Sequence, residues 1–311
     1  MKLVRARYPL KYVSSRSVVT VGNFDGIHLG HQALLHRLKQ ESRALNLPAI
    51  LMIFEPLSKE FFALQQRKVR LMRFREKWFS LKNYDIDEIL CLRFDQHLAD
   101  LSPERFVEEI LVKQLHIAAI IVGDDFRFGA KRAGTTALLR QMGLQHNFSV
   151  ISVPTVEIAG ERVSSTRIRA ALQAGCLEEA QQLLGRPFSV MGKVIYGKAL
   201  GRRLGFPTAN IDLHREWSPV TGVFVVRVRL SDEQIHRGVA YVGTRPTLKE
   251  TDNTRILLEV NLLDFDTPLY GQLLQVEFLH QLRNEEDYPS LGALTQQIQQ
   301  DVIDARRFFS E

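Results

Sequence analysis

The sequence is short of cysteine and has no long apolar run. Only Cys91 and Cys176 occur among its 311 residues. Neither has a second Cys or a His nearby at metal-ligand spacing, which argues against a disulfide framework or a zinc site. Both thiols are expected to be buried. The longest purely apolar run, 117–122, is far shorter than the roughly 20 residues that span a bilayer, so the sequence predicts no transmembrane helix.

Two further absences concern targeting and charge. Residues 1–10 lack the apolar stretch and the small-residue cleavage site of a secretory signal, so a cytoplasmic location is expected. The chain has a net charge of +6, yet it contains no run of five basic residues. Scattered basic residues suit a polyanionic small molecule as well as a nucleic acid, so charge alone leaves both open.

The chain is long enough for two domains, since a domain usually holds roughly 100 to 200 residues. From residue 18 to about 155, strand-like and helical patterns alternate, which predicts βαβ units and a parallel sheet covered by helices. After residue 187, strand-like runs follow one another, which predicts an antiparallel sheet or small barrel. A boundary is expected at 185/186, where a helix end is followed by Gly and Pro.

The expected elements of the first part are strands 18–21, 49–54, 88–94, 117–122 and 148–153 and helices 31–46, 70–83, 102–115 and 134–143. The expected elements of the second part are strands 188–196, 222–230, 237–242, 255–263 and 273–280 and a closing helix through Leu291, Leu294, Ile298, Val302, Ala305 and Phe309.

Two glycines and two histidines follow the first of these strands, in the stretch GNFDGIHLGH (22–31). Gly22 and Gly26 allow a tight turn and a close approach of phosphate, and the N-terminus of the next helix favours an anion. His28 and His31, three residues apart, can face the same phosphate from the first helical turn. The alternative is an ordinary helix start with one capping and one solvated histidine.

The stretch VGDDFRFG (122–129) leaves a second apolar strand. Its polar side chains can contact a ribose or base, and its two rings can offer an aromatic face; the alternative is an acidic turn above two core phenylalanines. The residues concerned are Asp124, Asp125, Phe126, Arg127 and Phe128.

A third stretch, VSSTRIR (163–169), opens a helix with three hydroxyls and two arginines. These groups suit phosphate oxygens at a helix N-terminus. The alternative is an ordinary N-cap with a solvated basic face.

The second half contains a glycine-rich stretch at 192–210. Glycines at this density in a strand context predict a loop that wraps closely around a ligand, or else a barrel corner. Thr208 and Asn210 carry oxygens suited to Mg²⁺ and phosphate. Glu259 lies in a probable strand, where its carboxylate can act as a general base or can simply point to solvent.

Taken together, these stretches resemble the prokaryotic bifunctional riboflavin kinase/FMN adenylyltransferases, often called FAD synthetases. The matching motifs occur in family order and cover nearly the whole chain. They are TVGNFDGIHLGHQ, FEP with EFF, VGDDFRFGAKRAG, VSSTRIR, LLGRPFSVMGKVIYGKALGRRLGFPTANI, GVAYVGTRPTL, LLEVNLLDF and LYGQLLQVEFLHQLRNE.

The resemblance implies a Rossmann-like nucleotidyltransferase domain over 1–185. Such a domain moves AMP from ATP to the phosphate of FMN, which gives FAD and pyrophosphate without a covalent enzyme intermediate. His28 and His31 would stabilise charge on the α-phosphate and the leaving pyrophosphate. The implied ATP-binding residues are Gly22, Asn23, Phe24, Gly26, His28, His31, Ser164, Ser165, Thr166 and Arg169. The implied flavin and nucleotide region is Asp124, Asp125, Phe126, Arg127 and Phe128.

For residues 186–311 the resemblance implies a flavokinase, a six-stranded antiparallel barrel with a C-terminal helix. It would transfer the γ-phosphate of ATP to the ribityl 5′-hydroxyl of riboflavin, with Glu259 accepting the hydroxyl proton. The implied residues for Mg²⁺ and ATP are Gly192, Gly197, Gly201, Gly205, Thr208 and Asn210, the last two as metal ligands. The implied flavin region is Arg245, Thr247 and Arg283. The implied partners are riboflavin, FMN and ATP, with no tightly bound prosthetic group, nucleic acid or membrane.

Five positions depart from the family pattern: Thr135, Ser58, Lys59, Tyr241 and Asn261. Two other hypotheses stay open at this point. One is a non-catalytic flavin or nucleotide sensor, and the other is an adenylyltransferase whose barrel serves only for docking.

Overall fold

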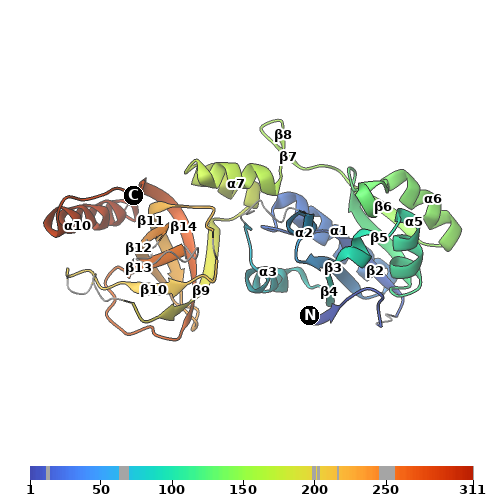
Figure 1. Ribbon diagram of the computed structural model, residues 1–311, viewed down its shortest axis with the longest axis horizontal. Helices are drawn as coiled ribbons and strands as arrows, with labels where there is room; N and C mark the ends of the chain where they lie inside the picture. Colours follow the sequence, from blue (N-terminus) through green and yellow to red (C-terminus); the bar gives the residue numbers. More distant parts are fainter. Residues whose placement is uncertain are drawn as a thin grey trace. The chain divides into compact units, whose positions relative to one another are not determined.

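The protein forms two compact units in the computed structural model (Figure 1). The structure describes residues 1–11, 15–62, 70–197, 201, 204–215, 217–244 and 256–310. The first unit comprises Met1–Lys68 and Arg73–Ser164, and the second comprises Val69–Met72 and Ser165–Glu311. The division of activities at residue 185 remains a prediction, because compactness alone does not assign an activity.

A parallel sheet of six strands forms the centre of the first unit, as the alternating pattern predicted. Its strand order is β1-β4-β3-β2-β5-β6. The sequence missed β1, whose KLVRA has two basic residues and is only partly buried. The strands are β1 (Lys2–Ala6), β2 (Ser17–Val21), β3 (Ala49–Glu55), β4 (Glu88–Arg93), β5 (Ile117–Gly123) and β6 (Ser149–Val153), with a separate hairpin of β7 (Glu157–Ile158) and β8 (Glu161–Arg162).

Helices connect these strands, as expected for a parallel sheet. The predicted helix at 102–115 forms as α5 followed by a π-helical segment, η2. Ser102 caps it, because its hydroxyl accepts the N–H of Arg105 at 3.3 Å, and Pro103 is at the first helical position. The helical segments are α1 (Leu29–Leu45), α2 (Ser58–Phe62), α3 (Phe74–Leu81), η1 (Lys82–Tyr84), α4 (Gln96–Ala99), α5 (Pro103–Arg105), η2 (Phe106–Val112), η3 (Ala130–Arg132) and α6 (Thr136–His146).

The strand order reverses direction at the centre of the sheet. From β2 the chain proceeds to β3 and β4 on one side, whereas β5 and β6 lie on the other side of β2. In open sheets of this kind, ligands bind beyond the carboxyl ends of the strands at such a reversal. The stretches GNFDGIHLGH and VGDDFRFG leave the carboxyl ends of β2 and β5, so both predicted sites flank this point.

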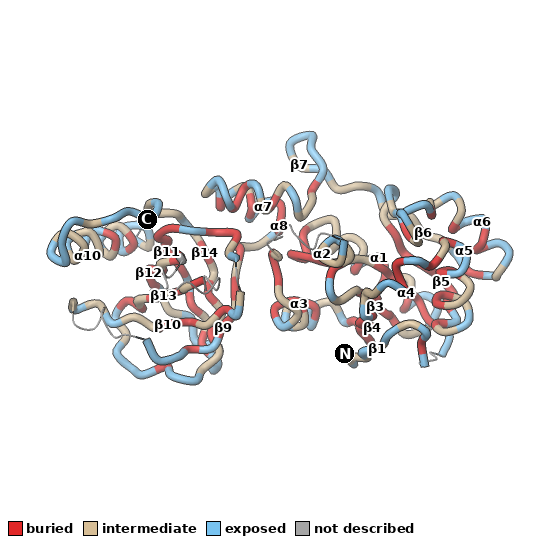
Figure 2. Tube along the Cα trace, viewed as in Figure 1, coloured by how far each residue is buried: buried red, intermediate tan, exposed pale blue. Residues whose placement is uncertain are grey.

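The central strands are buried because helices cover both faces of a parallel sheet. Every residue of β2 is buried, as are the first five of β3. Figure 2 shows buried chain concentrated in the sheet and in the barrel strands of the second unit. Cys91, in β4, is buried as expected.

A closed barrel of six antiparallel strands forms the second unit, in the order β10-β13-β12-β11-β14-β9. Strand β13 alternates buried and half-buried residues, the period-2 pattern of a strand with two different faces. The sequence missed β10, which has four residues and directly follows the glycine-rich stretch. The strands are β9 (Phe188–Ile195), β10 (Ala209–Asp212), β11 (Gly222–Arg229), β12 (Ile235–Thr244), β13 (Ile256–Leu262) and β14 (Leu273–Arg283).

The helices α7 (Ser165–Gln173), α8 (Leu177–Leu184) and α10 (Leu291–Phe308) accompany the barrel. Helix α8 contacts β14 and β9, while α10 lies on β11, β12 and β14, where Ala305 packs against valines of the barrel. Gly175 follows α7 with φ +75°, the left-handed conformation in which glycine commonly ends a helix. The expectation of a buried Cys176 is wrong, because this residue is the exposed N-cap of α8. None of the helices in the described ranges is both long and apolar enough to cross a membrane.

Candidate active sites

The loop between β2 and α1 has an unusual backbone. Phe24 (φ 48°) and Ile27 (φ 45°) both lie in the left-handed region, and both side chains are fully buried. For a β-branched residue this conformation is a genuine outlier. Gly26 has φ 91°, which only glycine adopts readily. The loop is therefore strained at the carboxyl end of the strand where a ligand is expected.

His28 and His31 form one stacked pair at the start of α1. The helix begins at Leu29, so His28 is its N-cap, and the N–H of His31 donates to Nδ1 of His28 at 3.4 Å. The two ring centroids lie 3.7 Å apart with an interplanar angle of 21°. His31 also lies beside the ring of Phe24 at 4.7 Å. His28 is therefore a capping histidine, as the alternative interpretation expects. His31 is half-buried against His28 and Phe24, whereas that interpretation expects a solvated side chain.

The surroundings of His31 favour its neutral form. Burial holds the pKa of its imidazole well below the ordinary 6.5, and the nearby His28, Lys77 and Arg162 lower this pKa further. Its Nδ1 is buried and has no hydrogen-bond partner within the described residues. An unpartnered buried nitrogen in a positive environment is suited to receive an anionic ligand.

Sequence reasoning missed two basic residues at this site. Lys77, on α3, is buried, and its ammonium donates to the carbonyl oxygen of Asn23 at 2.6 Å. One signal was available: Lys77 is three residues after Phe74 and four before Leu81, so it lies on the apolar face of its helix. Arg162, on β8, forms an ion pair with Asp125.

The predicted flavin and nucleotide region has its own internal contacts. Asp124 accepts from the hydroxyl of Thr155 at 2.7 Å, which helps to hold the pKa of its carboxyl below the ordinary value. Phe126 stacks on Phe128 at 5.6 Å, and Phe128 is part of the core. Arg127 is exposed. These contacts agree with the alternative interpretation of an acidic turn above core phenylalanines. That the residues of this region bind flavin or nucleotide stays a prediction.

A second aromatic group lies at the carboxyl ends of β3 and β4. Phe94 makes edge contacts with Phe54, Phe61 and Phe62 at centroid distances of 5.8, 5.4 and 5.7 Å. The side chain of Phe62 is 66% exposed. Its open ring face can stack on a planar ligand.

The residues of VSSTRIR fall on both sides of the division between the units. Ser164 ends the first unit, whereas Ser165, Thr166 and Arg169 belong to α7 of the second. Arg169 donates to the carbonyl oxygen of Ser165 at 3.1 Å. That these groups hold the triphosphate opposite the histidines remains a prediction.

One row of cross-strand neighbours forms the candidate site on the barrel. Asn210 of β10 pairs with Glu259 of β13, which pairs with Tyr241 of β12. Tyr241 pairs with Val223 of β11, which pairs with Arg283 of β14. Directly opposed residues share a face of the sheet. All five side chains therefore line one wall.

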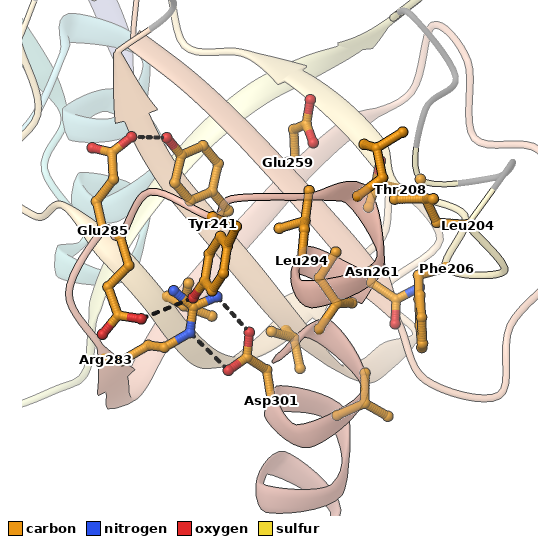
Figure 3. A pocket seen from close by; sticks show the side chains of 18 of the residues that line it. Leu204, Phe206, Thr208, Tyr241, Glu259, Asn261, Arg283, Glu285, Leu294 and Asp301 are labelled. Atoms are coloured by element: carbon orange, nitrogen blue, oxygen red, sulfur yellow. Dashed lines mark hydrogen bonds and ion pairs between the residues drawn. The ribbon is translucent and has the colours of Figure 1, made fainter. Parts of the chain in front are cut away.

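That wall belongs to a cavity of about 690 Å³, which is also lined by the loop before β10, by the segment between β14 and α10, by α10 itself and by Val239 and Asn261 of the barrel strands. Figure 3 shows Glu259 and Thr208 in one part of this cavity and the linked pairs Tyr241–Glu285 and Arg283–Asp301 in another. The remaining lining includes apolar side chains such as Leu204, Phe206 and Leu294. A cavity whose exposed lining is mostly apolar, with polar groups at separate places on its wall, suits a flat organic ligand that also carries polar groups.

Arg283 and Tyr241 are both held by partners. Two nitrogens of Arg283 donate to the carboxylate of Asp301 at 2.9 and 2.7 Å, which ties β14 to α10. The hydroxyl of Tyr241 donates to Glu285. Burial, this hydrogen bond and the negative charges of Glu285 and Glu259 raise the pKa of Tyr241 well above 10. The tyrosine therefore stays protonated at working pH.

Asn210 and Thr208 supply oxygens to the cavity. Asn210 is buried, and its Oδ1 has no hydrogen-bond partner in the part of the chain that the structure describes. A Cβ at Gly197 would lie 2.2 Å from the amide of Asn210, so glycine is needed there. Asn261, where the family pattern has another residue, donates to the carbonyl of Pro207 at 2.8 Å and so steadies the segment before Thr208.

The other glycines predicted to bind ATP have different settings. Gly201 lines the cavity, and a Cβ there would lie 2.4 Å from the carbonyl of Phe206. Gly192 lies within β9, where a Cβ would lie 2.5 Å from Ile211, so packing in the barrel accounts for it. Gly205 has φ +88°. Arg245 and Thr247 lie outside the described residues.

Within the described ranges, no cluster of three or more His, Cys, Asp or Glu side chains forms a ready metal cage. Hydroxyl, amide and carboxylate oxygens at one end of the cavity instead suit a hard cation that also binds phosphate oxygens. Both candidate sites are thus suited to phosphate-bearing ligands, as in nucleotide-dependent transferases.

Comparisons with known proteins agree with this class. The FAD synthetase family model matches residues 11–167, and the riboflavin kinase family model matches 184–309. A protein of Haemophilus influenzae is 42% identical over 310 residues, which cover 100% of both chains. One of Escherichia coli (strain K12) is 44% identical, covering 99% of this chain and 98% of the other. Both are named bifunctional riboflavin kinase/FMN adenylyltransferase.

A crystal structure described as a macrolide-efflux protein from Streptococcus pneumoniae has the same fold. It covers 98% of this chain and 99% of its own, with a TM-score of 0.85 and 31% sequence identity. The chain belongs to the bifunctional riboflavin kinase/FMN adenylyltransferase family, with an FAD synthetase domain followed by a riboflavin kinase domain. This confirms the predicted family, fold class and pair of ATP-dependent activities.

Proposed function

We propose that the stacked histidines of the sheet unit carry adenylyl transfer and that the oxygen-lined end of the barrel cavity carries phosphoryl transfer. The main support is the row that places Asn210 and Glu259 directly opposite each other beside a cavity large enough for a flavin ring. The two sites also differ in chemistry, since one offers imidazole nitrogens and the other offers oxygens.

In the kinase reaction, the 5′-hydroxyl oxygen of riboflavin attacks the γ-phosphorus of ATP. The bond from that phosphorus to the bridging oxygen breaks, ADP leaves, and FMN forms. The carboxylate of Glu259 accepts the hydroxyl proton. Because phosphoryl transfer depends mostly on positioning, the fixed strand pairing of Glu259 is well suited to this role.

We further propose that the kinase site binds Mg²⁺. Thr208 and Asn210 would hold the ion together with phosphate oxygens of ATP, and the unpartnered Oδ1 of Asn210 fits such a ligand. When bound, the ion neutralises charge on the phosphates.

In the adenylyl transfer, a phosphate oxygen of FMN attacks the α-phosphorus of ATP. The bond from that phosphorus to the β-bridging oxygen breaks, and FAD and pyrophosphate are formed. His28 and His31 stabilise the charge that develops on the α-phosphate and on the leaving pyrophosphate. The triphosphate is held by Ser164, Ser165, Thr166 and Arg169. The flavin stacks on aromatic side chains at the carboxyl ends of the strands, such as Phe62.

A single assay tests this assignment. Purified protein is supplied with riboflavin, ATP and Mg²⁺, and FMN and FAD are quantified by chromatography. His31→Ala should stop FAD formation while FMN still accumulates. Asn210→Ala should stop FMN formation but leave FAD synthesis from added FMN. A folded variant that loses both products would contradict the division.

A further inference from the structure

Lys77 is a buried charged residue that the assigned chemistry does not use. It lies on the inner face of α3 with 2% of its surface exposed. Lysine is almost never buried unless its ammonium is compensated. Burial of this kind points to a role for the charge.

The ammonium of Lys77 reaches the strained loop directly. Its Nζ lies 2.6 Å from the carbonyl oxygen of Asn23. The next residues include Phe24 and Ile27, both in the left-handed region. Such conformations are unfavourable for residues other than glycine and persist only where the surroundings enforce them. The Lys77 hydrogen bond is one such constraint, applied where the loop leaves β2.

Lys77 also acts on the histidine pair through its charge. The groups that lower the pKa of His31, after burial, are His28 from the helix cap, Lys77 from α3 and Arg162 from β8. Lys77 therefore lies close enough to influence the imidazole at the end of the same loop, where the phosphates of ATP would bind.

We propose that Lys77 is a positioning residue for adenylyl transfer, whose ammonium holds the loop 23–27 and with it the stacked pair of His28 and His31. The proposal rests on the role assigned above to the two histidines. Removing the ammonium lets the loop relax and displaces the imidazoles from the reacting phosphate.

Three variants test this: Lys77→Met, which removes the charge, Lys77→Arg, which keeps it, and Lys82→Met, an exposed lysine at the end of the same helix. FAD formation from added FMN should fall by about 100-fold in Lys77→Met, because a misplacement near 1 Å can cost that much. FMN formation in the same sample should stay within about twofold of wild type, because the barrel is untouched. Lys77→Arg should recover much of the FAD-forming rate, and Lys82→Met should match wild type.

A second readout separates positioning from simple packing. The titration of His31, followed by NMR of its imidazole, should move toward a higher pKa in Lys77→Met and should not move in Lys82→Met. Lys77→Gln, which keeps a donor without the charge, replaces the Met variant in both measurements if that variant does not fold. An unchanged FAD-forming rate, or a reduced rate with an unchanged His31 pKa, would overturn the proposal. If His31→Ala still makes FAD, the role of the histidines is what fails, whatever Lys77→Met does.

Discussion

Asn210 and Glu259 occupy directly opposed positions on β10 and β13, so an amide and a carboxylate share one wall of the barrel cavity. Because backbone pairing places them, their separation does not depend on how a loop closes. The buried and unpartnered Oδ1 of Asn210 adds an acceptor at the same place. The polar end of the proposed kinase site is thus built into the barrel itself.

Glu259→Gln should abolish the base and keep the shape of the cavity. General-base groups contribute typically about 10²–10⁴-fold, so FMN formation should fall by that order while FAD formation from added FMN is unchanged. Initial rates of both reactions give the measurement. Glu277→Gln is the matched control, since Glu277 is another strand-borne glutamate of the barrel and pairs with Arg227 at 3.1 Å. A normal kinase rate in Glu259→Gln would remove the carboxylate from the mechanism.

His31 should make stability depend on pH. Its pKa is lowered in the folded state, so the unfolded chain binds this proton more readily. The stabilisation is therefore complete above about pH 6.5 and is lost as the pH falls below it. Between pH 7.5 and pH 5.5, wild type should lose up to about 1.4 kcal/mol more than His31→Gln. Urea unfolding at both pH values measures this difference. Equal losses in the two proteins would show that His31 protonates freely when folded.

Tyr241→Phe should loosen the part of the cavity that contains Tyr241 and Glu285, beside the proposed flavin residue Arg283. The change removes the hydrogen bond to Glu285 and leaves the ring in place. Glu285 then no longer fixes the Tyr241 ring, so KM for riboflavin should rise with little change in kcat. The full value of a bond to a charged group, about 1.5–3 kcal/mol, sets an upper limit of about 100-fold on this rise. Steady-state kinase kinetics measure both constants. A fall in kcat alone would instead link the phenol to the chemical step.

Asp301→Ala should destabilise the barrel strongly. Asp301 and Arg283 are only 5% and 16% exposed, so losing the carboxylate leaves a largely buried guanidinium without this partner. Breaking a buried pair costs about 3–5 kcal/mol. The control is Asp264→Ala, because the pair of Asp264 with Arg306 is 73% and 51% exposed and should contribute less than about 1 kcal/mol. Thermal or urea unfolding compares the two, and equal effects would contradict the argument.

Much of the fold could be predicted from periodicity. The buried strands and the long helices have regular patterns, and Ser102 and Gly175 mark helix ends by known chemistry. Strands β1 and β10 could not be found, because one is half-exposed and basic and the other has four residues. Their pairing comes from neighbours distant in the sequence, which periodicity does not report.

The candidate sites could be predicted in part. The sequence singled out His28, His31, Asn210 and Glu259 as candidates, and their catalytic roles stay predictions. It could not show that the two imidazoles stack or that Asn210 and Glu259 are cross-strand partners. Lys77 was missed because a lysine on the apolar face of a helix is usually counted as an exception to the pattern rather than as part of a site.

The alternation of buried and half-buried residues along β13 also limits which mutations the protein can tolerate. Leu258 and Val260 are buried on the face opposite to Glu259. An in-frame loss of one codon within this strand would shift its pairing by one residue and exchange the two faces. The carboxylate would then enter the barrel interior, and an aliphatic side chain would face the substrate. Gene variants with such single-codon deletions should therefore lose FMN synthesis together with barrel stability, whereas codon substitutions at the same positions can separate the two effects.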